Sequence, residues 1–304
     1  MTAGSHRECP SCGTAGGIHH QGAWIWRKCP STDCGLLWLD PLPEADAVSR
    51  AYDGYFTHRD PAPPPPVSFR HSLGRFGGRA IARLARVEPE RAKLRLMCLG
   101  GVSPGRLLDV GCGDGRETMR FRDLGWKVQG VDTDPLAAER ARARCGLDVR
   151  VGSLESSRLA PETFDAVILS HVLEHALDPL GLLREALRLL EPGGRLVAIT
   201  PNGASLGHSV FGSSWLGLDP PRHRQVFSPP SLGRLARQAG ANRLRVWTSA
   251  AHAERYARGS LAVGRGEGPG GPSPVRDAIV SHAFQLLASL VAAVTDGRGE
   301  DCVL

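Results

Sequence analysis

The chain lacks the long apolar runs and dense charged blocks that mark several classes of protein. It contains no stretch of about 18 consecutive apolar residues, so we expect no membrane span. Its first residues contain no apolar signal core, which predicts a cytoplasmic protein. The formal net charge is +6, but the arginines are scattered and form no basic stripe with interleaved aromatic residues, which argues against a nucleic-acid partner.

The remaining composition is that of a globular protein of 304 residues, of which 41% are hydrophobic. This length is enough for one catalytic domain and a small additional module. Residues 60–66 are rich in proline and predict a stiff linker, and residues 70–99 have the pattern of an amphipathic helix. We therefore divide the chain into a cysteine-containing module at 1–58, a linker at 59–69, a main domain at 70–258, and a Gly/Pro-rich linker with a C-terminal helix at 259–304.

Three glycines at alternate positions follow an acidic residue in the segment 109–115. An apolar segment, 106–108, precedes them, and a helix-like segment, 116–124, follows. A strand that ends in such glycines turns tightly, and its backbone can approach a ligand because no Cβ atoms intervene. The N-terminus of the next helix presents free N–H groups to the same ligand. Arg116 replaces the last glycine of the dinucleotide fingerprint G-x-G-x-x-G, and the pyrophosphate of NAD needs that glycine.

Further apolar segments alternate with helical stretches along the chain. Asp132 ends the second of them and lies 21 positions after Gly111, where a doubly wound fold places an acid against ribose hydroxyls. The pattern predicts an α/β fold with a doubly wound, mostly parallel, Rossmann-like sheet. The expected strands after the first are 128–131, 148–151, 164–169 and 195–200.

These segments, in this order, resemble those of class I S-adenosylmethionine-dependent methyltransferases of the small-molecule type. The matching segments are 107–115, 130–135, 164–179 and 190–202. The resemblance implies a cofactor, S-adenosylmethionine, whose methionine end lies at the Gly-rich loop, whose ribose meets Asp132 and whose adenine lies at 153–154. Ser153 departs from the acidic residue that is common there. The resemblance places these residues at the cofactor: Asp109, Gly111, Cys112, Gly113, Asp132, Thr133, Ser153, Leu154 and Ser170.

Four cysteines near the N-terminus form two close pairs, each followed by a glycine. Two such pairs can close a tetrahedral structural zinc site. The segment resembles the zinc-ribbon leader of some bacterial methyltransferases of sugars and secondary metabolites. His19 or His20 is an alternative ligand, because the second pair is more widely spaced than usual; reduced thiols without a metal and a redox C-x-x-C are the other interpretations. The spacing is C-x2-C-x16-C-x4-C, formed by Cys9, Cys12, Cys29 and Cys34.

Chemistry is expected beyond the carboxyl ends of the strands, where ligands bind in open α/β sheets. Methyl transfer is an in-line displacement, so the enzyme mainly aligns the acceptor and removes its proton, a task that suits histidine. His171, Glu174 and His175 follow the fourth strand. They are interpreted as a base with a supporting carboxylate, as a divalent-metal site, or as the packed start of a helix. Methyltransferases of the quinone-biosynthesis type have acid-x-x-acid-His here, and His171 replaces the first acid; an inverted zinc-protease motif is rejected.

A second candidate segment contains two prolines that fix the backbone before Arg222 and His223. Arg222 is predicted to bind a carboxylate or phosphate of the substrate, and His223 is a second candidate base. A loop anchored by Arg222 to a backbone carbonyl is the alternative.

The sequence therefore predicts a methyltransferase that acts on oxygen of a small molecule, such as a sugar, a quinone-like aromatic or a secondary metabolite. Two alternatives stay open. One is an RNA methyltransferase that holds nucleic acid with its zinc module, and the other is a non-catalytic protein that binds the cofactor or a partner. The C-terminal helix, 275–294, is predicted to pack in the core, with a homodimer or membrane-surface contact as the alternative.

Overall fold

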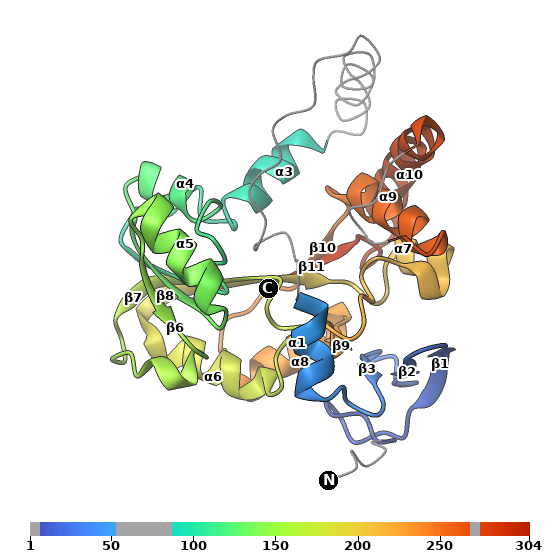
Figure 1. Ribbon diagram of the computed structural model, residues 1–304, viewed down its shortest axis with the longest axis horizontal. Coiled ribbons are helices and arrows are strands. Elements are labelled where there is room, and N and C mark those ends of the chain that lie inside the picture. Colours follow the sequence, from blue (N-terminus) through green and yellow to red (C-terminus); the bar gives the residue numbers. More distant parts are fainter. Residues whose placement is uncertain (1–6, 53–86, 268–273) are drawn as a thin grey trace.

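The computed structural model describes residues 7–52, 87–267 and 274–304 (Figure 1). Its largest feature is a seven-stranded sheet with the strand order β10-β11-β8-β7-β4-β5-β6. The five strands from β4 to β8 run parallel to their neighbours, whereas β11 is antiparallel to both β8 and β10. This confirms the predicted doubly wound, mostly parallel α/β fold. The strands are β4 (Arg106–Val110), β5 (Lys127–Asp132), β6 (Asp148–Val151), β7 (Phe164–Ser170), β8 (Leu190–Pro201), β10 (Trp247–Ser249) and β11 (Asp301–Val303).

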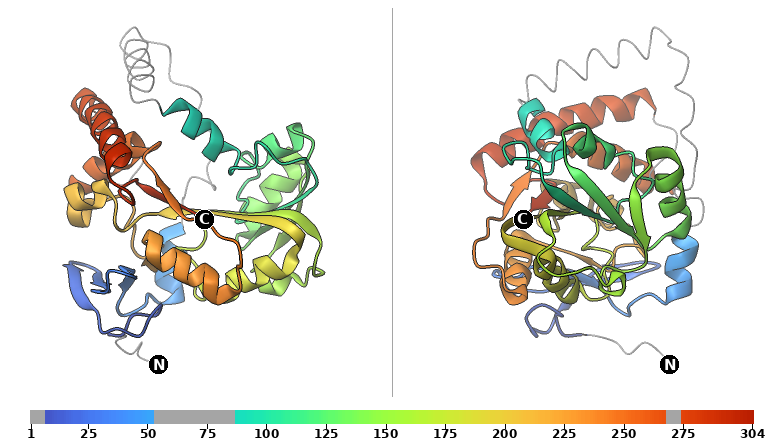
Figure 2. Two further views of the ribbon diagram at one scale, coloured as in Figure 1. Left: turned by 180° about the vertical axis from the view of Figure 1, so that it is seen from behind. Right: turned by 90° about the vertical axis from the view of Figure 1, so that its left-hand side faces the viewer.

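Helices cover both faces of this sheet (Figure 2). On one face, α6 (Pro179–Leu189) and α8 (Pro229–Ala239) bury leucines against alternate residues of β4 and β7. On the other, α3 (Glu88–Arg95) and α4 (Met119–Asp123) pack against the intervening residues of the same strands, and α5 (Pro135–Cys145) covers β5 and β6. The alternation follows from the two-residue period of a strand, which is why β4 and β7 are apolar almost throughout.

The strand order reverses beside β4, because β5 and β6 lie on one side of it and β7 and β8 on the other. Loops diverge from the sheet at such a point and leave a crevice outside the carboxyl ends of the strands. The loops after β4, β5 and β7 contain the residues that the sequence assigns to the cofactor and to chemistry. The topology therefore brings the two groups of residues to one edge of the sheet.

The N-terminal module forms most of a second, antiparallel sheet, whose strand order is β1-β2-β3-β9 (Figure 1). The first three strands are β1 (Gly17–Gln21), β2 (Ile25–Lys28) and β3 (Leu37–Leu39), and α1 (Ala45–Tyr52) follows them. The fourth strand, β9 (Gln225–Val226), comes from the loop before α8. Trp26 and Leu37 share a buried cluster with Trp215 and Tyr256 of the main part of the protein. The module is thus joined to the rest of the molecule by a shared strand and a shared core.

The C-terminal part contains α7 (Leu206–Phe211), α9 (Ala253–Gly264) and α10 (Val275–Val294). The predicted helix at 275–294 is confirmed, but several of its apolar residues are exposed, including Ile279 and Leu290. By length and composition alone α10 is apolar enough to cross a membrane, with 28% of its apolar window buried. Polar residues interrupt this apolar run, as the sequence indicated, and the expectation that the chain has no membrane span stays a prediction.

Two expected helices differ from the observed ones. The segment 116–124 is helical only over α4, Met119–Asp123, because the preceding residues still belong to the turn of the Gly-rich loop. Most of the predicted helix at 70–99 and the linker at 59–69 lie outside the described residues; within them, only α3 is helical. The strand β11 was not predicted at all, since its three residues lack the length of a recognisable pattern.

Candidate active site

The Gly-rich loop leaves β4 through a left-handed backbone that glycine adopts without strain. Gly111 has φ +72°, and a Cβ atom built on it would lie 2.7 Å from Cγ2 of Val172. Gly113 has φ +56°. A larger residue at Gly111 would therefore strain the backbone and push into the loop after β7. This close approach shows that the predicted cofactor loop and the predicted catalytic loop touch each other.

Asp132 ends β5 and fixes the shape of the Gly-rich loop. Its Oδ2 accepts a hydrogen bond from the Gly113 amide at 2.7 Å, and its Oδ1 accepts one from the Asp134 amide at 2.8 Å. Burial raises the pKa of Asp132, while these two amides work in the opposite direction. A carboxylate held in this way at the end of the second parallel strand is suited to accept hydrogen bonds from ribose hydroxyls.

Asp109 lies beneath the loop and is buried. Its Oδ2 accepts a hydrogen bond of 2.6 Å from the Thr118 hydroxyl, which itself is fully buried. Burial raises the pKa of Asp109 to about 7, although the Thr118 hydrogen bond lowers it. Asp109 therefore ties the end of β4 to the start of α4, a partnership that the sequence did not reveal.

The other predicted cofactor residues divide into two groups. Thr133, Ser153 and Ser170 are exposed and follow or end β5, β6 and β7 at the same edge of the sheet. Cys112 and Leu154 are buried. The Cys112 thiol packs in the apolar cluster under α5, so its backbone is the part that faces the loop.

His171, Glu174 and Thr200 form a hydrogen-bonded chain at the carboxyl ends of β7 and β8. His171 Nδ1 lies 3.1 Å from Glu174 Oε1, and the Thr200 hydroxyl donates to Glu174 Oε2 at 3.0 Å. Glu174 is 0% exposed, whereas 44% of the His171 side chain is exposed. Because a carboxylate accepts, Nδ1 of His171 donates and Nε2 is left with the lone pair.

The electrostatics of this hydrogen-bonded group favour an ionised Glu174. Burial opposes its charge, but the hydrogen bond from His171 and the nearby histidines outweigh burial and lower the pKa of Glu174 to about 2. Partial desolvation of the His171 ring opposes its charge, but the hydrogen bond and charge of Glu174 outweigh this effect and raise the pKa of His171. The pair therefore stabilises a proton on His171.

The backbone of His171 is also unusual. Its φ is +56°, a left-handed conformation that non-glycine residues rarely adopt, and its amide donates to the Ile199 carbonyl at 2.8 Å. Strain of this kind persists where the surrounding structure enforces it, and such sites are commonly functional. The conformation turns the chain sharply at the end of β7 and sets the position of the His171 ring.

The second predicted segment, with Arg222 and His223, folds back onto the first. His175 Nδ1 lies 3.0 Å from the Arg222 carbonyl, and the His175 and His223 rings meet edge to face at 4.7 Å between centroids. His223 Nδ1 lies 2.8 Å from the Gly217 carbonyl. Arg222 is buried and its guanidinium pairs with Asp219, so its charge is balanced within the protein. Burial and the nearby His223 lower the pKa of His175 to about 4.

The donor atoms that suit a divalent metal here are those of Glu174, His175 and His223, which all lie within 4.8 Å of one another. This group differs from the predicted one, because His223 joins it and His171 does not. Both Glu174 oxygens already accept hydrogen bonds from protein groups. A metal at this place stays a prediction.

The four N-terminal cysteines converge as predicted. Their sulfurs lie within 4.8 Å of one another, and the pairs Cys9–Cys34 and Cys12–Cys29 are separated by 3.6 and 3.5 Å. Sulfurs bound to one tetrahedral zinc at about 2.3 Å would be separated by roughly 3.8 Å, so the cluster fits zinc. His19 and His20 belong to a different cluster and do not join the sulfurs.

Sequence reasoning missed several polar residues around the site. Thr200 ends a recognised strand, so a polar residue at its carboxyl end was a usable signal. Tyr256 and Asp301 carried no signal; the Tyr256 hydroxyl donates to Asp301 at 2.6 Å, and this buried pair joins α9 to β11.

A family model described as a methyltransferase domain matches residues 70–246, which is more than half of the chain. The chain therefore belongs to the class I S-adenosylmethionine-dependent methyltransferases. It is an enzyme of that class, in agreement with the prediction from its motifs.

Curated relatives of the chain match it over part of their length. The ubiquinone biosynthesis O-methyltransferase of Cereibacter sphaeroides is 34% identical over 146 residues, which cover 44% of this chain and 59% of that protein. The protein of the same name from Alkalilimnicola ehrlichii is 30% identical over 165 residues, covering 50% of this chain and 67% of that protein. The chain thus spans 59% of the length of the first of these relatives.

Solved structures with a similar fold share less sequence. A methyltransferase of Thermotoga maritima, described as a possible histamine N-methyltransferase, is 22% identical with a TM-score of 0.47, covering 74% of this chain and 96% of that one. One from Archaeoglobus fulgidus is 19% identical with a TM-score of 0.48, covering 71% and 92%. At these identities the likeness concerns the fold alone.

Proposed function

We propose that the protein transfers a methyl group from S-adenosylmethionine to a hydroxyl oxygen of a small molecule. The observation that carries this proposal is the chain from Thr200 through Glu174 to His171 at the carboxyl ends of β7 and β8. The relationship to O-methyltransferases of ubiquinone biosynthesis supports oxygen as the acceptor atom.

The residues of the Gly-rich loop and Asp132 would hold the cofactor. A Cβ atom at Gly111 would fill the turn, and the Gly113 amide already orients the Asp132 carboxylate, so the loop is preformed. When bound, S-adenosylmethionine supplies an electrophilic methyl group on a sulfonium. The protein then has to position the acceptor and take its proton.

His171 is the proposed base. Its Nδ1 donates to Glu174, so its Nε2 accepts the proton of the acceptor hydroxyl, and the ionised Glu174 stabilises the imidazolium that results. Thr200 holds the second oxygen of Glu174 and prevents the carboxylate from rotating. The acceptor hydroxyl becomes a stronger nucleophile as it loses its proton.

The four-cysteine cluster is proposed to hold one structural zinc. Its four sulfurs lie at one end of the short antiparallel sheet, where β1 begins, β2 ends and β3 begins. A metal there would fix the module that shares β9 with the main domain. Metal analysis of the purified protein, before and after Cys12→Ser, tests this assignment.

The test of the function uses labelled S-adenosylmethionine and a panel of acceptors: catechols, hydroxylated quinones, sugars and an unstructured RNA. Label transferred to a hydroxyl compound and lost with His171→Ala supports the proposal. His282→Ala, which changes a histidine of α10, is the matched control and should retain activity. Transfer to RNA alone, or transfer that survives His171→Ala, would contradict it.

A further inference from the structure

A bulge in β1 points two consecutive histidines to the same side of the N-terminal sheet. Ile18 pairs with Arg27 and His20 pairs with Trp26, so His19 is an extra residue without a partner in the register. Consecutive residues of a regular strand point to opposite faces, and a bulge removes that alternation. The rings of His19 and His20 accordingly lie 4.3 Å apart between centroids.

A third histidine approaches them from α7 of the main domain. His208 is buried, and its Nδ1 lies 2.7 Å from the Gly203 carbonyl. A carbonyl only accepts, so Nδ1 donates and Nε2 keeps its lone pair, the arrangement that orients a metal-binding histidine. That Nε2 lies 2.9 Å from Nε2 of His20, and the three histidines each offer a ligand atom within 4.8 Å of the others.

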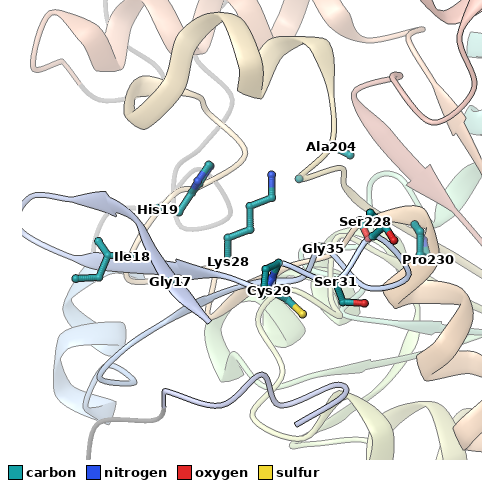
Figure 3. Close-up of a pocket in the computed structure, with 13 residues that line it drawn as sticks. Gly17, Ile18, His19, Lys28, Cys29, Ser31, Gly35, Ala204, Ser228 and Pro230 are labelled. Atoms are coloured by element: carbon teal, nitrogen blue, oxygen red, sulfur yellow. The ribbon is translucent and has the colours of Figure 1, made fainter. Parts of the chain in front are cut away.

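The surroundings of all three imidazoles favour the neutral form. Burial, reinforced by the charge of Lys28, lowers the pKa of His19 and of His208 to about 4 and also lowers the pKa of His20. Neutral imidazole is the form that binds metals. Lys28 is the charge that opposes a cation here; its side chain and that of His19 project from adjacent strands and line one cleft (Figure 3).

We propose that His19, His20 and His208 form a second metal site, which binds a divalent transition metal of the zinc type and clamps β1 to α7. Three imidazole nitrogens suit zinc, nickel, cobalt and copper, whereas magnesium and calcium prefer oxygen. The three ligands leave a fourth position for water. Because two ligands come from the N-terminal module and one from the main domain, binding would tie the two together and stabilise the folded protein.

The alternative is a simple hydrogen bond between His20 and His208 with His19 stacked beside it. The two arrangements differ in what they require of His19. A hydrogen bond between the other two histidines persists without His19, whereas a three-ligand site loses a third of its donors. His19 is exposed, so its removal leaves the core intact.

The experiment measures cobalt and zinc binding to the 304-residue chain after one equivalent of zinc has been added to load the proposed cysteine site. Wild-type protein should bind one further equivalent, without the thiolate-to-cobalt absorption that a cysteine site gives. His19→Ala and His208→Gln should each weaken this second binding by at least about tenfold, a loss on the scale of removing a group that supports a metal site. His282→Ala is the control, and Lys28→Gln should tighten binding, because it removes the opposing charge.

Bound metal should also raise the melting temperature of the wild-type protein and not that of His19→Ala, which keeps the test valid if His208→Gln folds poorly. One metal per chain, held by sulfur alone, would overturn the proposal. So would a second site with equal affinity in wild-type protein and His19→Ala.

Discussion

The proposed cofactor end and the proposed acceptor end of the active site are built in different ways. At the cofactor end, Gly111, Gly113 and Asp132 lie within 22 residues of sequence and are joined through backbone amides. At the acceptor end, His171, Glu174 and Thr200 are joined by side-chain contacts across two strands, and the Arg224 amide donates to the Glu174 carbonyl. In the proposed function, the first arrangement holds the cofactor, which is common to the family, largely through the backbone. The second would contact the acceptor through side chains, and substitutions there can change the acceptor without changing the fold.

The largest expected effect comes from the acceptor end. His171→Ala should lower the rate of methyl transfer by about 10²–10⁴-fold, the usual contribution of a general base. Its affinity for the cofactor should stay within about twofold of wild type, because the proposal assigns that ring to the acceptor and the binding of the cofactor to the Gly-rich loop and Asp132. Single-turnover kinetics with saturating cofactor measure the first quantity. A comparable loss in cofactor affinity would contradict the assignment of His171 to the acceptor end alone.

Asp132→Ala makes the converse test at the cofactor end. The ribose loses a charged acceptor and the Gly113 amide loses its partner, so cofactor affinity should fall by about 10–100-fold, or about 1.4–2.7 kcal/mol. At saturating cofactor the rate should recover to near that of wild type. Asp132→Asn, which keeps one acceptor oxygen, should lie between the two. Unchanged affinity in Asp132→Ala would refute the assignment of β5.

Thr200→Val replaces the threonine with a side chain of nearly the same shape that lacks the hydroxyl. In the proposed function this hydroxyl supports Glu174 and does not contact the acceptor. Glu174 Oε2 would lose a hydrogen bond worth about 1 kcal/mol, and kcat should fall by roughly fivefold with little change in KM. If Thr200 acts by positioning Glu174, Thr200→Ser, which keeps the hydroxyl, should retain a kcat close to that of wild type. A rate equal to wild type would mean that Glu174 needs no second support.

The smallest effect concerns pH. His171 acts as a base only when deprotonated, and Glu174 raises its pKa, so kcat/KM should rise as pH increases through a midpoint above about 6.5. Glu174→Gln keeps the shape but removes the charge, so the midpoint should move to lower pH. An unshifted midpoint would show that another group titrates.

The pH dependence of the free energy of unfolding tests the interaction between His171 and Glu174 independently of activity. A raised pKa of His171 contributes stability that is complete below its unfolded value and lost as pH rises through the folded one. A lowered pKa of Glu174 contributes stability above about 4.5 that is lost as pH falls toward about 2. The pair therefore stabilises the fold most between these limits, and Glu174→Gln should remove that pH dependence in denaturant unfolding.

Features set by local sequence could be predicted, whereas contacts between residues far apart in the sequence could not. The Gly-rich loop, the strands β5 and β6 and the cysteine pairs could be predicted because their partners are a few residues away or follow a fixed spacing. The contact between His20 and His208, and that between Tyr256 and Asp301, join segments far apart in sequence and depend on the packing of whole elements. Arg222 illustrates the same limit, since its pairing with Asp219 depends on how one loop folds.

The most direct test of the two-part site is calorimetric titration of S-adenosylhomocysteine into wild-type protein, Asp132→Ala and His171→Ala under one set of conditions. Micromolar affinity in wild type, a loss of at least about tenfold in Asp132→Ala and an unchanged value in His171→Ala would establish that the two ends act separately. Equal losses in both variants, or no binding to a folded wild-type protein, would contradict the account.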